Sequence, residues 1–132
     1  MTYLLDTNVC IRYLNGRSPA VRKRLESLRP ADIAVCSVVK AELLAGAQKS
    51  RYPERTLANV RKFLASFRSL PFDDASAEIY GVIRADLERR GTPIGPYDLQ
   101  IASIALAHNL ILVTHNVREF GRVVGLRIDD WE

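Results

Sequence analysis

The stretch Tyr3-Leu4-Leu5-Asp6-Thr7-Asn8 sets the organisation of the chain. Its first three residues form an apolar run whose length favours a buried strand over a helix. A helix is predicted over residues 9–14, capped by Thr7 or Asn8 and ended by Asn15-Gly16. A buried strand that ends in a carboxylate and leads straight into a helix is typical of an α/β fold.

The same alternation continues along the rest of the sequence. Buried strands are predicted at 33–36 and 111–114, and weaker strands at 70–72, where Pro71 indicates an edge, and at 126–128. Further helices are predicted at 18–28, 38–48, 54–67, 73–90, 96–109 and 117–120, with Ser18 and Ser37 as caps of the first two. We therefore expect one α/β domain over residues 1–132, built on a central, mostly parallel sheet of four to five strands.

Composition is that of an ordinary globular chain. Of its 132 residues, 48% are hydrophobic and 26% are charged. Cys10 and Cys36 are the two cysteines; no C-x-x-C pair exists, and their apolar neighbours predict packed, reduced thiols. No secretory leader and no run of about 18 apolar residues is present, so we expect a cytoplasmic location and no membrane contact.

The net charge of +4 is only weak evidence for a nucleic-acid partner. A basic cluster lies between positions 12 and 29, opposed there only by Glu26. Arginine supplies most of this charge, and its guanidinium group suits phosphates as well as carboxylates. Two interpretations stay open at this point: a solvated basic surface, or a surface that binds phosphate.

Five polar residues fall where the carboxyl ends of parallel strands are expected. In an open parallel sheet, ligands bind in the crevice beyond those ends. The candidates are Asp6, Glu42, Asp98, Asn116 and Glu119. Each carboxylate alone also has a plain structural explanation, as a helix cap, an exposed helix residue or a first-turn helix acid. Together at one edge of the sheet they favour a site for a hard cation.

Several close carboxylates repel one another unless a cation lies between them. Mg²⁺ or Mn²⁺ prefers oxygen ligands, whereas the sequence lacks the histidine and cysteine spacing typical of zinc. A bound metal can activate water in line with phosphorus, so the site predicts phosphodiester hydrolysis. His108, at a helix end, and His115, near the site, are not expected to be catalytic.

These residues also carry a resemblance to a known family. The chain resembles PIN-domain ribonucleases, and among them the VapC toxins. The matching blocks are Leu4–Asn8, Ser37–Leu43 with Gly46, Gly95–Asp98 with Ile101-Ala102, Leu112–Phe120, and Val123–Leu126 with Trp131. The likeness covers nearly the whole chain, with its blocks in the family's order.

The resemblance implies a PIN-like α/β/α sandwich and an Mg²⁺- or Mn²⁺-dependent endoribonuclease. Asp6, Glu42 and Asp98 match the family's acidic metal-binding triad. Where many members carry a fourth acid this sequence has Asn116, and Glu119 could take its place. The polar residues that match supports around the carboxylates are Thr7, Asn8, Ser37 and Thr114.

The resemblance further implies a toxin that forms a homodimer and a hetero-oligomer with a VapB-type antitoxin, through which it meets DNA only indirectly. Structured RNA is the implied substrate, and one branch of the family cuts initiator tRNA in the anticodon loop. The main alternative is a catalytically silent module that binds RNA or protein. A haloacid-dehalogenase-like phosphatase is disfavoured because Asn8 stands where its second aspartate is needed.

Overall fold

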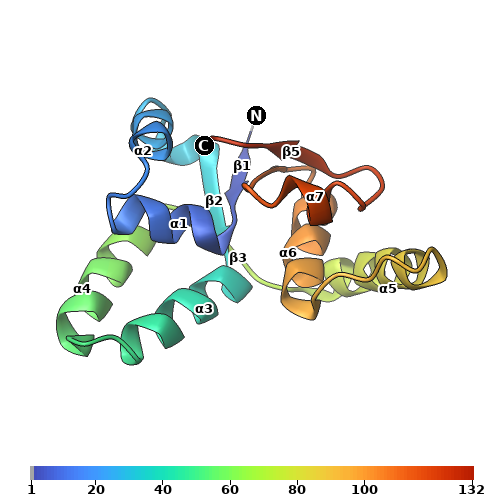
Figure 1. Ribbon diagram of the computed structural model, residues 1–132, viewed down its shortest axis with the longest axis horizontal. Helices are drawn as coiled ribbons and strands as arrows, with labels where there is room; N and C mark the ends of the chain where they lie inside the picture. The colour runs from blue at the N-terminus through green and yellow to red at the C-terminus, as the bar shows by residue number, and fades with distance from the viewer. Residues whose placement is uncertain (1) are drawn as a thin grey trace.

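The computed structural model describes residues 2–132, in which short strands and helices alternate (Figure 1). The strands are β1 (Tyr3–Leu5), β2 (Ile33–Cys36), β3 (Arg68–Leu70), β4 (Ile111–Val113) and β5 (Arg127–Asp129). The helices are α1 (Thr7–Leu14), α2 (Pro19–Glu26), α3 (Ser37–Gln48), α4 (Pro53–Leu64), α5 (Asp74–Arg89), α6 (Pro96–Ala107) and α7 (Val117–Phe120), with a short 3-10 helix at Pro30–Asp32.

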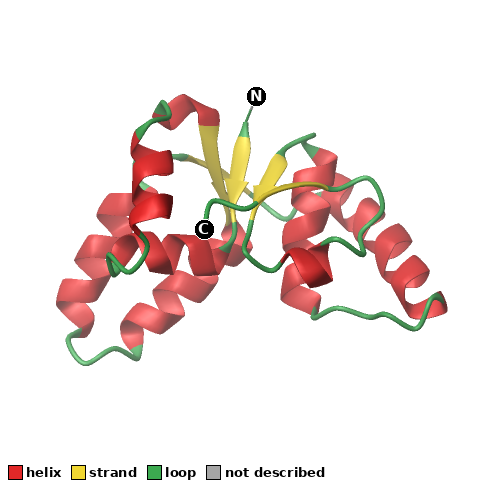
Figure 2. Ribbon diagram, turned by 45° about the horizontal axis from the view of Figure 1, so that its top comes forward, coloured by secondary structure: helices red, strands yellow, loops and turns green. Residues whose placement is uncertain are grey.

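The five strands form one parallel sheet in the order β3-β2-β1-β4-β5. Helices α1 to α4 lie to one side of it and α5 to α7 to the other, so the sheet is the middle layer of three (Figures 1 and 2). The predicted α/β/α sandwich with a mostly parallel sheet is confirmed, and the pairing is parallel throughout.

Strand β1 occupies the centre of the sheet, and the chain builds outward from it in two directions. It first adds β2 and β3 on one side, then crosses through α5 and α6 to place β4 on the other side of β1. The crevice of such a sheet opens where the direction of building reverses. Here that point lies between the carboxyl ends of β1 and β4, immediately before Asp6 and Thr114.

Strands covered by helices on both faces need apolar side chains on both faces. All four residues of β2 are buried, and Leu4, Leu5, Leu112 and Val113 are fully inaccessible. Helix α6 is buried around most of its circumference, since it packs against α5 as well as the sheet. This rigid centre holds the ends of β1 and β4 in fixed positions.

Several predicted boundaries and caps need correction. Asp6 itself caps α1, in place of Thr7 or Asn8, because its side chain accepts from the Thr7 N–H. Ser37 is the first residue of α3 and makes no capping bond, whereas Ser18 caps α2 as predicted. The strand expected at 70–72 lies at 68–70, and α4 ends at Leu64 instead of position 67.

Aromatic packing secures the segment that follows β5. Trp131 is 7% exposed and meets the ring of Tyr3 edge-on at 5.5 Å between centroids. Its indole Nε1–H donates to Asp129 at 3.0 Å, and Arg24 lies over both rings. The segment is thereby fixed against β1 and α2.

Both cysteines are buried and free, in agreement with the prediction of packed thiols. Burial raises the pKa of the Cys36 thiol to about 11, so it is protonated at neutral pH. Within residues 2–132, no helix combines the length and the apolar character that crossing a membrane requires.

Candidate active site

Asp6 lies at the centre of the candidate site, directly after β1. Its backbone N–H donates to the Val113 carbonyl at 3.0 Å, which extends the pairing of β1 with β4 by one residue. One side-chain oxygen, Oδ1, accepts from the Thr7 N–H at 2.8 Å, and Oδ2 accepts from the Thr114 hydroxyl at 2.8 Å. Only 6% of Asp6 is exposed, so these bonds fix the direction of its carboxylate.

Opposing effects act on the pKa of the Asp6 carboxyl. Burial raises the pKa of its carboxyl, and repulsion from Glu42 adds to that increase. The hydrogen bonds from Thr114 and Thr7 act in the other direction, because they stabilise the charged form. The net result is a raised pKa, which marks a carboxylate that lacks a compensating positive charge.

Glu42 approaches the same space from the second turn of α3. The Thr7 hydroxyl donates to its Oε1 at 3.0 Å. Thr7 thereby joins two carboxylates, since its backbone N–H binds Asp6 and its hydroxyl binds Glu42. Thr7 is buried while Glu42 is exposed, so a fixed support holds a carboxylate that faces solvent.

Asp98 comes from the opposite layer, in the first turn of α6. Burial raises its pKa to about 6, and repulsion from Asp6, Glu119 and Glu42 contributes in that order. Three carboxylates from different elements therefore act on Asp98 through space. The sequence-based expectation that these distant acids meet at one rim agrees with this arrangement.

Asn116 and Glu119 complete the rim from α7. The Asn116 side-chain amide donates to Glu119 Oε2 at 3.0 Å, and its backbone N–H donates to the Thr114 hydroxyl at 3.0 Å. Thr114 is fully buried, and its hydroxyl in turn donates to Asp6, so hydrogen bonds connect Asn116 to Asp6. Of the two residues considered for the fourth acidic position, Glu119 brings the charge and Asn116 positions it.

The remaining residues considered from the sequence are less closely involved. Asn8 is exposed and lines the hollow beside Asp6. Ser37 is exposed, and its hydroxyl donates to the Leu70 carbonyl at 3.5 Å instead of to a carboxylate. His108 ends α6 with its Nε2 3.8 Å from Asp73, away from the rim.

These four residues, Asp6, Glu42, Asp98 and Glu119, have the ligand chemistry of a divalent-cation site, although no three of them place carboxylate oxygens all within 4.8 Å of one another in the structure. Across residues 2–132, no ion pair joins a lysine, arginine or histidine to Asp6, Glu42, Asp98 or Glu119. The donors are all carboxylate oxygens, which are the ligands that Mg²⁺ and Mn²⁺ prefer. A cation at this position would offset the burial and the repulsion that together raise the pKa of Asp98.

A family model described as "PIN domain" matches residues 3–126, which is nearly the whole chain. The chain belongs to the PIN domain family. The resemblance inferred from the sequence is thereby confirmed.

Named relatives cover this PIN domain almost end to end. The protein called tRNA(fMet)-specific endonuclease VapC from Shigella flexneri is 44% identical over 99% of this chain and 98% of its own. Ribonuclease VapC2 from Rickettsia felis is 38% identical over 100% of this chain and 99% of its own.

Solved structures agree with the sequence comparison. The DNA-bound VapBC structure from Salmonella typhimurium matches this PIN domain with a TM-score of 0.94 at 42% identity, covering 100% of this chain and 99% of the other. VapBC2 from Rickettsia felis, bound to a promoter DNA fragment, matches with a TM-score of 0.93 at 37% identity, with both chains covered completely.

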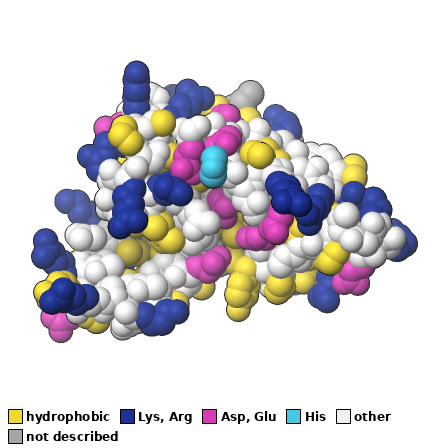
Figure 3. Space-filling model, viewed as in Figure 1, with side chains coloured by type: hydrophobic (Ala, Val, Ile, Leu, Met, Phe, Trp, Pro, Cys, Tyr) yellow, Lys and Arg dark blue, Asp and Glu magenta, His cyan; other side chains and the backbone are white. Residues whose placement is uncertain are grey.

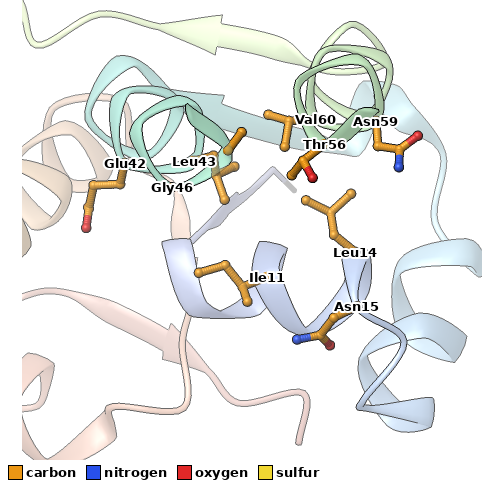
Figure 4. Close-up of a pocket in the computed structure, with 10 residues that line it drawn as sticks. Ile11, Leu14, Asn15, Glu42, Leu43, Gly46, Thr56, Asn59 and Val60 are labelled. Atoms are coloured by element: carbon orange, nitrogen blue, oxygen red, sulfur yellow. The ribbon is translucent and has the colours of Figure 1, made fainter. Parts of the chain in front are cut away.

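Two hollows border the acidic rim of this PIN domain. The first, of about 420 Å³, is largely apolar and lies among α1, α3 and α4, with Leu14, Leu43 and Val60 in its lining. Figure 4 shows Glu42 at one end of it, with the carboxylate turned away from the α4 side chains. The second, of about 510 Å³, is polar and contains Asp6 and Asn116.

Acidic side chains gather in the middle of this face of the PIN domain, with basic side chains to either side (Figure 3). The sequence did not indicate one acidic group, which Asp130 and Glu132 form in the segment after β5. His115 Nδ1 lies 3.0 Å from Asp130 Oδ2 and 3.9 Å from Glu132 Oε2. No local sequence motif predicts this contact, because it depends on the neighbouring ends of β4 and β5 in the sheet.

Proposed function

We propose that this PIN domain is a metal-dependent endoribonuclease that serves as the toxin of a toxin–antitoxin pair. The observation that carries the proposal is that Thr7 binds both Asp6 and Glu42 at the rim, where burial and three neighbouring carboxylates also raise the pKa of Asp98 to about 6. Groups whose pKa is shifted by desolvation and by specific charged neighbours in a cleft are characteristic of functional sites. The names of the relatives point to the same activity.

Asp6, Glu42 and Asp98 would hold Mg²⁺ or Mn²⁺, with Glu119 as a further acid at the rim. Such an ion, when bound, supplies an activated water and positive charge near the reacting phosphate. The protein's own contribution is orientation. Thr7 and Thr114 fix the Asp6 carboxylate with two hydrogen bonds of 2.8 Å, one to each oxygen.

The substrate class proposed is structured RNA, with initiator tRNA as the first candidate. The name of the Shigella flexneri relative specifies tRNA(fMet), and 44% identity over almost the full length supports carrying that substrate over. The rim is open to solvent at Glu42 and only partly covered at Asp98. A single strand in a loop can reach such a site more easily than a closed duplex.

The partner proposed is a VapB-type antitoxin. Structures of this fold from Salmonella typhimurium and Rickettsia felis are VapBC complexes that include DNA. We propose that this chain forms a toxin homodimer within a complex of this kind. The complex would contact DNA through the antitoxin. Because the rim is strongly acidic, a basic side chain of an antitoxin would compete there with metal and RNA together.

Cleavage of an initiator tRNA transcript with Mg²⁺, Mn²⁺ or EDTA tests the activity. Cleavage is expected with either metal and not with EDTA, and Asp98→Asn is expected to abolish it while the circular dichroism spectrum is unchanged. Arg68→Gln, at the amino end of β3 and far from the rim, is the matched control. Tight RNA binding without cleavage under any metal would instead support the silent module.

A further inference from the structure

Two arginines border the acidic site on the side of α1. Arg12 and Arg17 line the polar hollow of about 510 Å³ that also contains Asp6 and Asn116. The hollow therefore brings Asp6 of the candidate metal site together with two arginines. No part of the activity proposed above uses these arginines.

The turn after α1 places the two arginines side by side. Gly16 adopts a φ of +69°, in the left-handed region that favours glycine. The Arg17 N–H then donates both to the Arg12 carbonyl at 3.2 Å and to Asn15 Oδ1 at 3.0 Å. These bonds turn the chain back, so Arg17 lies beside the last turn of α1 instead of continuing away from it.

Arg12 already binds an anion within the chain, the side-chain carboxylate of Glu132. Its Nε lies 3.0 Å from Glu132 Oε1, and 45% of the Arg12 side chain is exposed. Trp131, packed against Tyr3, holds the segment that carries Glu132 in place. Arg17 forms no ion pair among residues 2–132, so one guanidinium is neutralised and the other is available.

We propose that Arg12 and Arg17 form a subsite for a phosphate of the RNA strand, next to the phosphodiester held at the acidic rim. Glu132 acts as the internal competitor for that subsite. The inference rests on the proposed ribonuclease function and adds to it the residues that hold the strand. Guanidinium groups bind phosphate oxygens through paired hydrogen bonds, a geometry that a mobile lysine provides less well.

The exposed Arg12–Glu132 pair is weak enough for such an exchange. Ion pairs in contact with solvent contribute little, because water screens them and two side chains must be ordered. Under this proposal a phosphate would draw on both arginines of the hollow, which a single carboxylate at Arg12 does not. The ligand atoms of His115, Asp130 and Glu132 also lie within 4.8 Å of one another, so Arg12 pairs with a carboxylate that belongs to this small acidic group.

The test measures binding of a fluorescently end-labelled initiator tRNA transcript by anisotropy, over a series of KCl concentrations. The protein carries Asp98→Asn so that cleavage does not interfere. Arg12→Gln and Arg17→Gln are each expected to weaken binding roughly tenfold and to reduce the salt slope by about one. Arg68→Gln, which removes the same charge at the opposite edge of the sheet, should leave both quantities unchanged.

Glu132→Gln is expected to change RNA affinity in the opposite direction. Misfolding would weaken binding and not tighten it. Removing the competitor is expected to tighten RNA binding by roughly threefold. The subsite is refuted if Arg12→Gln and Arg17→Gln bind RNA as tightly as Arg68→Gln. Cleavage by the wild-type protein is measured separately, so its failure would remove the nuclease proposal while the binding data still decide the subsite.

Discussion

Replacing Asp98 by asparagine should stabilise the metal-free protein at neutral pH. The Asp98 carboxylate is partly buried and faces the carboxylates of Asp6, Glu119 and Glu42. Each of these features makes the charged form unfavourable in the folded state. Asparagine has nearly the same shape and no charge, so the substitution removes the repulsion and leaves the packing intact.

The magnitude follows from the pKa of Asp98, which rises from 3.8 to about 6. A shift of about two units corresponds to roughly 3 kcal/mol at about 1.4 kcal/mol per unit. Solvent screening at a partly exposed group reduces this to about 1.5 kcal/mol. Losing an acid from the first turn of α6 costs about 0.5 kcal/mol, which leaves a net gain of about 1 kcal/mol.

The direction of the Asp98 pKa shift also fixes how the stability of the fold depends on pH. A carboxyl whose folded-state pKa is raised favours the fold while protonated, and that contribution is lost as pH rises from about 4 through about 6. Asp98→Asn should therefore melt about 4 °C above the wild type at neutral pH in EDTA and equal it near pH 4. A variant that melts below the wild type in neutral EDTA would refute the electrostatic account of the site.

Three further results are expected. Mg²⁺ should raise the melting temperature of the wild type and not of Asp98→Asn, because binding to the folded state alone is stabilising; equal shifts would place the ion elsewhere. Thr114→Val should cost about 1–3 kcal/mol in urea unfolding and move the acid limb of cleavage to higher pH, because Asp6 loses a hydrogen bond that lowers its pKa; Thr114→Ser should retain both properties. Trp131→Ala should cost about 3 kcal/mol, and Trp131→Phe should recover most of it.

The buried parts of the fold could be predicted because parallel strands covered on both faces appear as short, continuous apolar runs. Strand β2 was predicted with its observed bounds, and β4 within one residue. The weaker prediction at 70–72 lay two residues too late. Arg68 and Ser69 belong to an exposed edge strand, and polar residues there leave no apolar pattern to detect.

The acidic residues of the site could be proposed because strand ends in a parallel sheet share one edge. The connections between them could not. Thr7, considered with Asn8 as a cap and matched to a polar support around the carboxylates, binds Glu42, and the sequence did not indicate this particular partner 35 positions away. The pairing of Arg12 with Glu132 likewise depends on the trace of the chain after β5, and neither residue lies in a motif that indicates the other.

The hydrogen bond between Thr114 and Asp6 joins residues 108 positions apart. Asp6 is synthesised about a hundred residues before the strand that completes its surroundings, which begins at Ile111. A ribosome that stops before that point releases a fragment without β4, and therefore without an assembled acidic rim. The acidic rim of this nuclease fold therefore assembles only after β4 has been made.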